Sequence, residues 1–266
     1  SGEPIKTDAL EALNLGGRVV IPGLIDCHMH GASGYDVMDA DLQGLEIIAE
    51  SLLKQGTTGF LATTMTMSDS CIEKALKAVA DYQDKYKKGE IGKLGAQILG
   101  VHLEGPFLSN KHPGAQNAKY IKAADIKLFD KWQDISNNQI KLVTIAPESF
   151  NNMDFIKHVK KHYPDVVISI GHSDASFEQA NEAIKAGACH CTHLYNAMSS
   201  FHHRKPGIPG AVLVSDDITA ELIVDGVHLH PGSVQLAVKA KGLDKLILVT
   251  DAMRARCMGN GEFDLG

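Results

Sequence analysis

The sequence lacks the features of membrane-spanning, disulfide-stabilised and nucleic-acid-binding proteins. No window holds about 18 uninterrupted apolar residues, the length that a membrane-spanning helix needs. There is no long block of lysine or arginine and the formal net charge is −6, so we expect no nucleic-acid partner and no membrane. The five cysteines are few and odd in number for a chain of 266 residues. They predict no disulfide framework and favour a reducing, cytoplasmic location.

Short apolar segments alternate with helical patterns along the chain, which is typical of β–α units and a parallel sheet. The predicted strands are 19–29, 59–64, 97–104, 141–146, 166–172, 190–195, 219–224 and 245–250. The predicted helices are 42–55, 70–86, 123–134, 153–162, 176–186 and 232–241. Eight strands with intervening helices predict an α/β fold, a (β/α)8 barrel of the TIM type. A doubly wound open sheet is the structural alternative.

Both ends of the chain depart from the barrel pattern. Residues 1–20 are too few for a domain, and we expect them to be a strand-and-turn remnant. Gly259, Asn260 and Gly261 interrupt the segment after the last predicted strand, where a barrel places a helix. We therefore expect residues 21–266 to form a barrel that is shortened at its C-terminal end.

The strongest chemical signal lies at the end of the first predicted strand, where Asp26, His28 and His30 alternate with other residues. Alternate side chains of a strand point to the same side, so His28 and His30 share a face. Two imidazoles at this spacing can hold one divalent metal ion from the end of a barrel strand. The alternative is that the two histidines only satisfy local hydrogen bonds.

A second pair, His102 and Glu104, ends the third predicted strand and shares a face by the same period. A carboxylate in such a place is costly unless it is paired or bound to metal. We therefore predict that Glu104 is a metal ligand. We expect His102 to support the site or to line the pocket rather than to bind the metal directly.

Three further polar residues, His172, His193 and Asp251, close later predicted strands. The carboxyl ends of barrel strands form one rim, and the active sites of such barrels lie there. The two histidines therefore join the earlier ligands in one predicted metal constellation. We predict that Asp251 is the general base and acid that works with metal-activated water. The alternative is a carboxylate that caps a turn.

Two loops offer groups for a substrate. His228, after the seventh predicted strand, is placed to polarise or hold a substrate. Arg204, in the loop after the sixth, carries a planar fork of donors that suits a phosphate or a carboxylate. A single arginine in a loop is alternatively a surface charge.

Six phrases of this sequence, taken together, resemble a known family. They run from residue 21 to about residue 253 and read PGLIDCHMH, HLEGPF, GHSDA, THLYNAM, IVDGVH and VTDAM. In order and spacing they are similar to the N-acetylglucosamine-6-phosphate deacetylases of the amidohydrolase superfamily. The first phrase alone indicates only the superfamily, whereas HLEGP and LYNAM point to the deacetylases.

The resemblance implies a homodimeric enzyme of amino-sugar metabolism that converts N-acetyl-D-glucosamine 6-phosphate to D-glucosamine 6-phosphate and acetate. It implies that Glu104, His172 and His193 hold the main divalent metal ion. His28 and His30 then hold a second ion, bridged by Glu104, so that each subunit carries one or two. Imidazole and carboxylate ligands suit both zinc and iron.

The resemblance also assigns the residues that act on the substrate. Asp251 is implied as general base and acid, and His228 as a contact to the sugar that supports the carbonyl. The residues implied for the sugar-phosphate site are Ala115, Asn196, Ala197, Arg204 and His228. Members of the family carry a small β-sandwich domain built from both chain ends, of which residues 1–20 are expected to be a remnant. Gln116 departs from the histidine that stands there in many members.

Two other functions remain open at this point. The first is another amidohydrolase that acts on a different amide, a cyclic amide, a nucleobase or a phosphate ester. Several such enzymes bridge two metal ions with a carboxylated lysine, whereas this sequence carries Glu104 at the third strand. The second is a non-catalytic relative with a binding or scaffold role, although such proteins typically lose metal ligands that this sequence retains.

Overall fold

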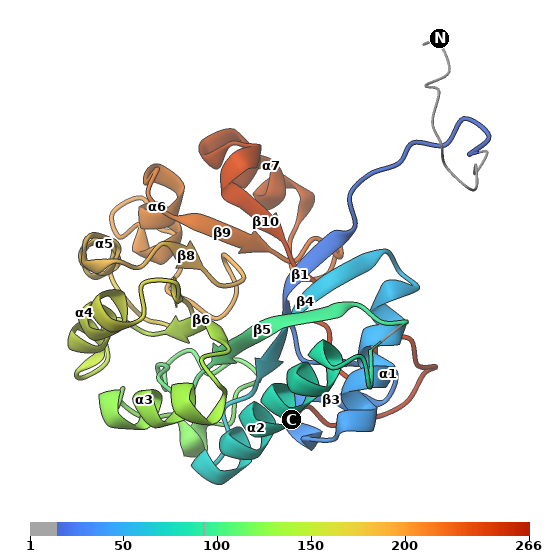
Figure 1. Cartoon of the computed structure of the whole chain (residues 1–266). Helices are drawn as coiled ribbons and strands as arrows, with labels where there is room; N and C mark the ends of the chain where they lie inside the picture. Colours follow the sequence, from blue (N-terminus) through green and yellow to red (C-terminus); the bar gives the residue numbers. More distant parts are fainter. Residues whose placement is uncertain (1–14, 93) are drawn as a thin grey trace, which may run out of the picture.

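The computed structural model describes residues 15–92 and 94–266. Its main sheet has eight parallel strands in the order β1-β4-β5-β6-β7-β8-β9-β10. The helices lie outside the strands (Figure 1). This sequential order confirms the predicted (β/α)8 barrel, because a doubly wound sheet reverses its strand order at a switch point. The strands are β1 Leu24–Met29, β4 Thr57–Thr64, β5 Gln97–Glu104, β6 Ile140–Ile145, β7 Val167–Ile170, β8 His190–Cys191, β9 Thr219–Leu222 and β10 Leu246–Leu248.

The described residues form seven α-helices in the connections between these strands. They are α1 Leu42–Leu53, α2 Asp69–Lys87, α3 Ile126–Ile135, α4 Asn152–His162, α5 Phe177–Ala186, α6 Gly207–Val214 and α7 Pro231–Lys241. Several begin at a polar side chain that accepts a hydrogen bond from the first turn, as N-caps do. These caps are Asp41, Ser68, Asp125 and Ser176.

Shorter elements complete the chain. The 3-10 helices are η1 Val37–Asp39, η2 Ala118–Tyr120 and η3 Leu243–Lys245. A small antiparallel pair, β2 Gly31–Ala32 and β3 Tyr35–Asp36, follows β1 directly. A Cβ on Gly31 would lie 2.2 Å from the backbone oxygen of Tyr35, so this tight turn after His30 requires glycine.

The first and last strands meet beyond their own ends. Met29 and Ala252 form a parallel bridge. Asp251 donates its N–H to the carbonyl of His28 at 2.9 Å, and His30 donates to the carbonyl of Ala252 at 2.7 Å. The barrel therefore closes at its carboxyl end, where these hydrogen bonds fix Asp251 beside His28 of β1 and His30, which follows it.

Aromatic side chains fill part of the core between the sheet and its helices. Phe107, Phe129, Trp132 and Phe155 are each at most 1% exposed. Their rings contact one another in sequence, with centroids 5.9 Å apart for Phe107 and Trp132 and 5.0 Å apart for Phe129 and Phe155. This cluster joins α3 and α4 to Phe107, which follows Glu104 by three residues.

Several predicted boundaries are wrong in instructive ways. The strand predicted over 19–29 begins only at Leu24, because Pro22 offers no N–H to a ladder. The strands predicted over 166–172 and 190–195 end at Ile170 and Cys191, which leaves the histidines of the site in the turns that follow. Helix α6 is absent from the predicted set because it combines helix-breaking residues with an apolar surface that gives no helical period. Residues 1–14 of the predicted remnant lie outside the described residues.

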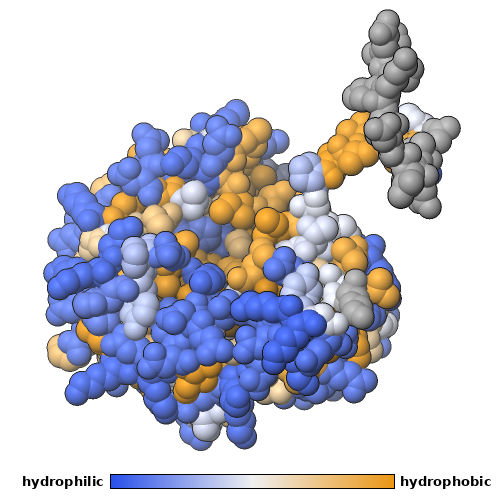
Figure 2. All heavy atoms as spheres, viewed as in Figure 1, coloured by the Kyte–Doolittle hydropathy of each residue, from blue (hydrophilic) through white to orange (hydrophobic). Residues whose placement is uncertain are grey.

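Apolar side chains are exposed around the N-terminal end of β1. No helix follows β10 within the described part of the chain. Figure 2 shows apolar surface in this region and along residues 19–21. The exposed residues here are Val19, Val20, Ile21, Leu24, Ile25 and Leu248. Among the helices that the structure describes, none is both long and apolar enough to cross a bilayer.

Candidate active site

The candidate site lies at the carboxyl ends of the strands. Glu104 is the last residue of β5, and His28 lies near the end of β1. Three other candidate residues, His172, His193 and Asp251, follow their strands with φ values of 46°, 30° and 47°. Non-glycine residues rarely adopt this left-handed conformation, and such strained positions cluster at functional sites.

Glu104, His172 and His193 converge on one point. Oε1 of Glu104 lies 3.2 Å from Nε2 of His172 and 3.2 Å from Nε2 of His193. The two Nε2 atoms are 3.1 Å apart. All three residues are at most 4% exposed. The three ligand atoms thus form a nearly equilateral triangle inside the mouth of the barrel.

His28, His30 and Asp251 form an adjoining group. Oδ1 of Asp251 lies 3.3 Å from Nε2 of His28 and 3.3 Å from Nε2 of His30. The carboxylate of Glu104 links the two groups. Its Oε1 belongs to the first triangle and lies 3.4 Å from Nε2 of His28, while its Oε2 lies 3.1 Å from Nε2 of His30.

The donor set of both groups fits divalent metal ions. A tetrahedral ion with bonds of about 2.0–2.1 Å keeps its ligand atoms about 3.3 Å apart. The distances within both groups lie close to this value. Nε2 of His28 is buried and makes no hydrogen bond, as an unsatisfied ligand atom would. Imidazole nitrogens and carboxylate oxygens are ligands that zinc and iron share.

The carboxylates of the site are held in their ionised form. Burial opposes ionisation of Glu104, but charged His28 and the hydrogen bonds from His172 and His193 hold its pKa well below the usual range. Burial also opposes ionisation of Asp251, yet the charge of His28 lowers the pKa of Asp251 too. The pKa of His28 is raised despite its burial, because Asp251, Glu104 and Glu221 surround it. The negative charge gathered here is what a bound cation needs.

The second ring nitrogen of each histidine decides how its ring is oriented. Nδ1 of His172 lies 3.0 Å from the backbone oxygen of His112. Nδ1 of His28 lies 2.9 Å from Oε2 of Glu221. In the described part of the chain, Nδ1 of His30 and of His193 has no hydrogen-bond partner. His28 is therefore the one histidine of these four whose orientation is set by a carboxylate.

A cavity of about 390 Å³ opens beside these residues. Its size suits a small-molecule substrate. It brings together most of the predicted site residues. Those that line it are His30, Glu104, Ala115, His172, His193, Asn196, Ala197, His228 and Asp251. His28 lies beneath them and is fully buried.

Besides the buried His28, two predicted residues, Arg204 and His102, lie outside the lining of this cavity. Arg204 is exposed, has its Nη1 2.8 Å from Nε2 of His203, and lines a different hollow. Among the described residues that line the site cavity there is no lysine or arginine. His102 also lies outside the lining, with its Nε2 2.7 Å from Oγ1 of Thr144 and its ring 4.5 Å from that of His28.

Sequence reasoning missed two residues that contact the site. Gln116 is buried, and its side-chain amide donates to Oε2 of Glu104. Glu221 contacts His28 from below. A charged residue inside the apolar strand 219–224 was a signal for Glu221, because burying a carboxylate is costly unless it is paired. Gln116 stands in a loop and carried no signal of its own beyond its departure from the family.

Comparison with known proteins agrees with this geometry. The chain is 46% identical over 248 residues to the N-acetylglucosamine-6-phosphate deacetylase of Bacillus subtilis (strain 168), covering 93% of this chain and 61% of that protein. It is 45% identical over 262 residues to the same enzyme of Lysinibacillus sphaericus, covering 98% of this chain and 66% of that protein. The chain thus spans less than two thirds of the length of these relatives.

A solved structure matches the fold. The N-acetyl-D-glucosamine-6-phosphate deacetylase of Mycobacterium smegmatis, a mutant in complex with N-acetyl-D-glucosamine-6-phosphate, superposes with a TM-score of 0.84 and 31% identity. The match covers 92% of this chain and 61% of that one. The model of the amidohydrolase family matches residues 19–257. The chain therefore belongs to the amidohydrolase family.

Proposed function

We propose that this chain carries the catalytic barrel of a metal-dependent deacetylase. The reaction is hydrolysis of N-acetyl-D-glucosamine 6-phosphate to D-glucosamine 6-phosphate and acetate. One observation carries this proposal: Glu104 joins two groups of metal-ligand atoms beside a cavity, with Asp251 at its wall. The names of the similar proteins supply the substrate class.

The proposed metal ligands fall into two sets. Glu104, His172 and His193 would hold the main ion, and His28 with His30 would hold a second ion next to Glu104. A divalent ion bound there, zinc or iron, would supply Lewis acidity toward the amide carbonyl and would lower the pKa of the attacking water. Both ligand sets come from the rigid carboxyl end of the barrel, which keeps their spacing fixed.

Asp251 is proposed to move the proton. Its side chain is partly exposed at the cavity wall, and its depressed pKa keeps it ionised near neutral pH. In this state it takes a proton from the attacking water and then delivers it to the nitrogen of the departing sugar amine. His228 lines the opposite part of the same cavity and is proposed to contact the sugar and support the acetyl carbonyl.

The sugar phosphate is proposed to contact Ala115, Asn196 and Ala197, which line the cavity, and Arg204. Arg204 is exposed and lies outside this lining. It can therefore reach a phosphate in the cavity only if its loop moves, or if the Arg204 of a second copy of the chain supplies the contact. We therefore also propose a homodimer. Arg204→Ala is expected to raise KM for the phosphorylated substrate while leaving unphosphorylated N-acetylglucosamine unaffected.

The proposed domain boundary places residues 21–266 in the catalytic barrel. Residues 1–20 are proposed to belong to a small β-sandwich domain of the kind that the family resemblance implies. The exposed apolar residues at the start of β1 lie next to this boundary. Contact with such a domain would remove their apolar surface from water, which is favourable.

The decisive experiment measures acetate release from N-acetylglucosamine 6-phosphate, with N-acetylglucosamine alongside. It uses protein of known metal content, both as this chain and in a full-length version. The matched control is Asp251→Asn, which keeps the shape of the side chain and removes its ability to accept a proton. Release that requires the phosphate and falls at least 100-fold in the variant supports the proposal. A folded, metal-loaded, full-length protein that releases no acetate refutes it and favours another amide substrate.

A further inference from the structure

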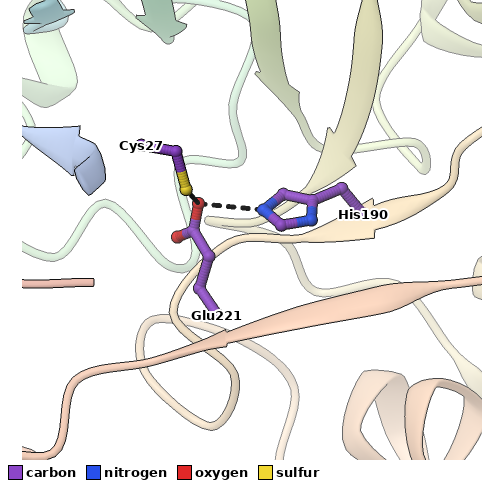
Figure 3. Close-up of side chains that lie close together, drawn as sticks. All are labelled: Cys27, His190 and Glu221. Atoms are coloured by element: carbon purple, nitrogen blue, oxygen red, sulfur yellow. Dashed lines mark hydrogen bonds and ion pairs between the residues drawn. The ribbon is translucent and has the colours of Figure 1, made fainter. Parts of the chain in front are cut away.

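Glu221 is a buried carboxylate that the proposed reaction does not use. It lies in β9 with its side chain inside the barrel, and it is 0% exposed. Figure 3 shows its carboxylate between Cys27 and His190. A charge in such a place is costly unless hydrogen bonds satisfy it.

Four groups surround the two oxygens of Glu221. Oε1 lies 2.9 Å from Nε2 of His190 and accepts from the thiol of Cys27 at 3.8 Å. Oε2 accepts from the backbone N–H of His193 at 3.0 Å and lies 2.9 Å from Nδ1 of His28. An ionised carboxylate has about four acceptor sites, so each oxygen is fully used.

This saturation decides between two functions for the cluster of Cys27, His190 and Glu221. Three such side chains within 4.8 Å of one another can hold a metal ion. Sγ of Cys27 lies 3.8 Å from Oε1 of Glu221, farther than the 3.1–3.4 Å that separate the carboxylate oxygens of Glu104 and Asp251 from their histidines. Nδ1 of His190 is also engaged, 2.7 Å from Oγ1 of Thr219. The cluster therefore works as a support that holds one oxygen of Glu221 in place.

The other oxygen then sets the state of His28. A carboxylate oxygen has no proton to give, so Nδ1 of His28 must carry the hydrogen of this contact. With its raised pKa, His28 is charged when no metal ion is bound. A metal ion bound at Nε2 would take the place of the proton there, and the ring would then offer its lone pair on Nε2. Nε2 is the atom that faces Oε1 of Glu104 at 3.4 Å and Oδ1 of Asp251 at 3.3 Å. The contact also fixes the plane of the ring.

We propose that Glu221 is a positioning residue for metal binding: supported by His190 and Cys27, it fixes the tautomer and the orientation of His28 so that Nε2 is presented to the second metal ion. This inference rests on the proposed metal-dependent function. It adds that the occupancy of the His28–His30 site depends on a residue that touches neither metal nor substrate. Carboxylate partners of this kind typically change metal affinity or activity by about 10–100-fold.

The test measures metal affinity directly, by competition with a chelator, on Glu221→Gln and Glu221→Asp. Glutamine keeps the size of the side chain but turns two of its four acceptor sites into N–H donors. We expect the affinity for the second zinc ion to fall about 10–100-fold in Glu221→Gln. The affinity for the first zinc ion should fall by at most about a few-fold. Glu221→Asp keeps the charge and is expected to recover part of the affinity. Circular dichroism confirms that each variant is folded.

Two matched controls remove other contacts of the same cluster. Thr219→Val takes away the hydroxyl next to His190, and Cys27→Ala takes away the thiol that meets Glu221. Both variants are expected to keep two zinc ions and to weaken the second by at most about a few-fold, because each removes one indirect support of Glu221 and leaves its contact with His28 in place. A third bound zinc ion that disappears in Cys27→Ala would overturn the proposal in favour of a separate metal site. Unchanged affinity for the second ion in a folded Glu221→Gln protein would overturn it as well.

The metal measurement separates this inference from the proposed reaction. If the original protein binds two ions but releases no acetate, the proposed substrate is wrong and the affinities still decide the role of Glu221. If acetate is released and Glu221→Gln changes only the thermal stability, the deacetylase proposal stands and Glu221 is structural. The affinity of the second ion is the readout that a purely structural role would not move.

Discussion

Gln116 donates a hydrogen bond from its side-chain amide to Oε2 of Glu104, over 2.6 Å. Its amide orientation is fixed from the other side, because its Oε1 accepts the backbone N–H of Thr66 at 2.7 Å. Glu104 is thus held at both oxygens, by histidines on Oε1 and by an amide on Oε2. Gln116 thus helps to orient the carboxylate that both groups of candidate ligands share.

Replacing Gln116 should weaken metal binding without unfolding the protein. In Gln116→Leu the carboxylate of Glu104 loses its amide donor, and we expect the metal affinity and the rate to fall about 10–100-fold. Gln116→His keeps a donor and should lose less. Gln235→Leu, an exposed position on α7, serves as the control. Chelator competition on folded protein measures the effect, and equal affinities for the leucine variant and the original protein would show that this hydrogen bond is dispensable.

Removing the metal should lower the melting temperature. An ion that binds only the folded state at 1,000 times its Kd stabilises it by about 4 kcal/mol. For a domain of this size about 1 kcal/mol shifts Tm by roughly 2–4 °C, so the loss is on the order of 10 °C. Differential scanning calorimetry before and after chelation measures it. Glu104→Gln, which removes the shared ligand charge, should show little difference between the two conditions, and the same Tm for the original protein with and without metal would contradict the assignment.

The loop that carries His228 should respond to acid in a narrow window. The backbone N–H groups of His228 and Val227, together with the ring of His228, lower the pKa of Asp225 to about 2. A carboxyl whose folded pKa lies below its ordinary value of about 3.9 stabilises the loop above that value and loses this effect as pH falls through the folded pKa. The order imposed on the loop should therefore disappear between about pH 4 and pH 2.

A titration of Asp225 by carbon-13 NMR tests this directly. We expect a midpoint near about 2 in the original protein. In His228→Ala the ring is lost and both backbone donors remain, so the midpoint should rise but stay below about 3.9. A midpoint at the ordinary value in the original protein would mean that these hydrogen bonds do not form in solution.

The barrel could be predicted because its signals are local and repeated. Apolar strands at regular spacing gave the β–α order, and the period of two placed His28 and His30 on one face. The structure places both imidazoles next to Glu104. Their roles as ligands remain a prediction. The ends of strands β7 and β8 could not be placed, because His172 and His193 adopt a left-handed conformation that only the completed site imposes.

Contacts between residues that lie far apart in the chain could not be predicted from the sequence. Glu221 lies 193 positions from His28, and no local pattern states that they meet. The same is true of Gln116 and Thr66, whose contact forms only when two loops fold against each other. Helix α6 was not predicted for a different reason. Its glycines and proline disfavour a helix locally, and tertiary packing stabilises it. The clustering of residues at the strand ends was therefore predictable, and the residues that support this cluster were not.

The aromatic cluster between the sheet and its helices should contribute strongly to the free energy of unfolding. Phe155 is 1% exposed and its ring lies 5.2 Å from that of Phe107 and 5.0 Å from that of Phe129. Phe155→Ala removes a large side chain from a closely packed core and should lower the free energy of unfolding by about 3–5 kcal/mol. Phe150→Ala, only a few residues away and 79% exposed, should change it by no more than about 0.5 kcal/mol.

Urea unfolding followed by Trp132 fluorescence measures both variants, because Trp132 stacks on Phe107 within this cluster. The slope of the transition should stay constant, so that the shift in midpoint reports stability alone. Since Phe107, which contacts Phe155, follows Glu104 by three residues, metal affinity in the folded Phe155→Ala protein should also fall, as Glu104 loses part of its rigid support. Equal stability losses for Phe155→Ala and Phe150→Ala would mean that the cluster is not packed as the structure has it, and the fixed position of Glu104 would then need another cause.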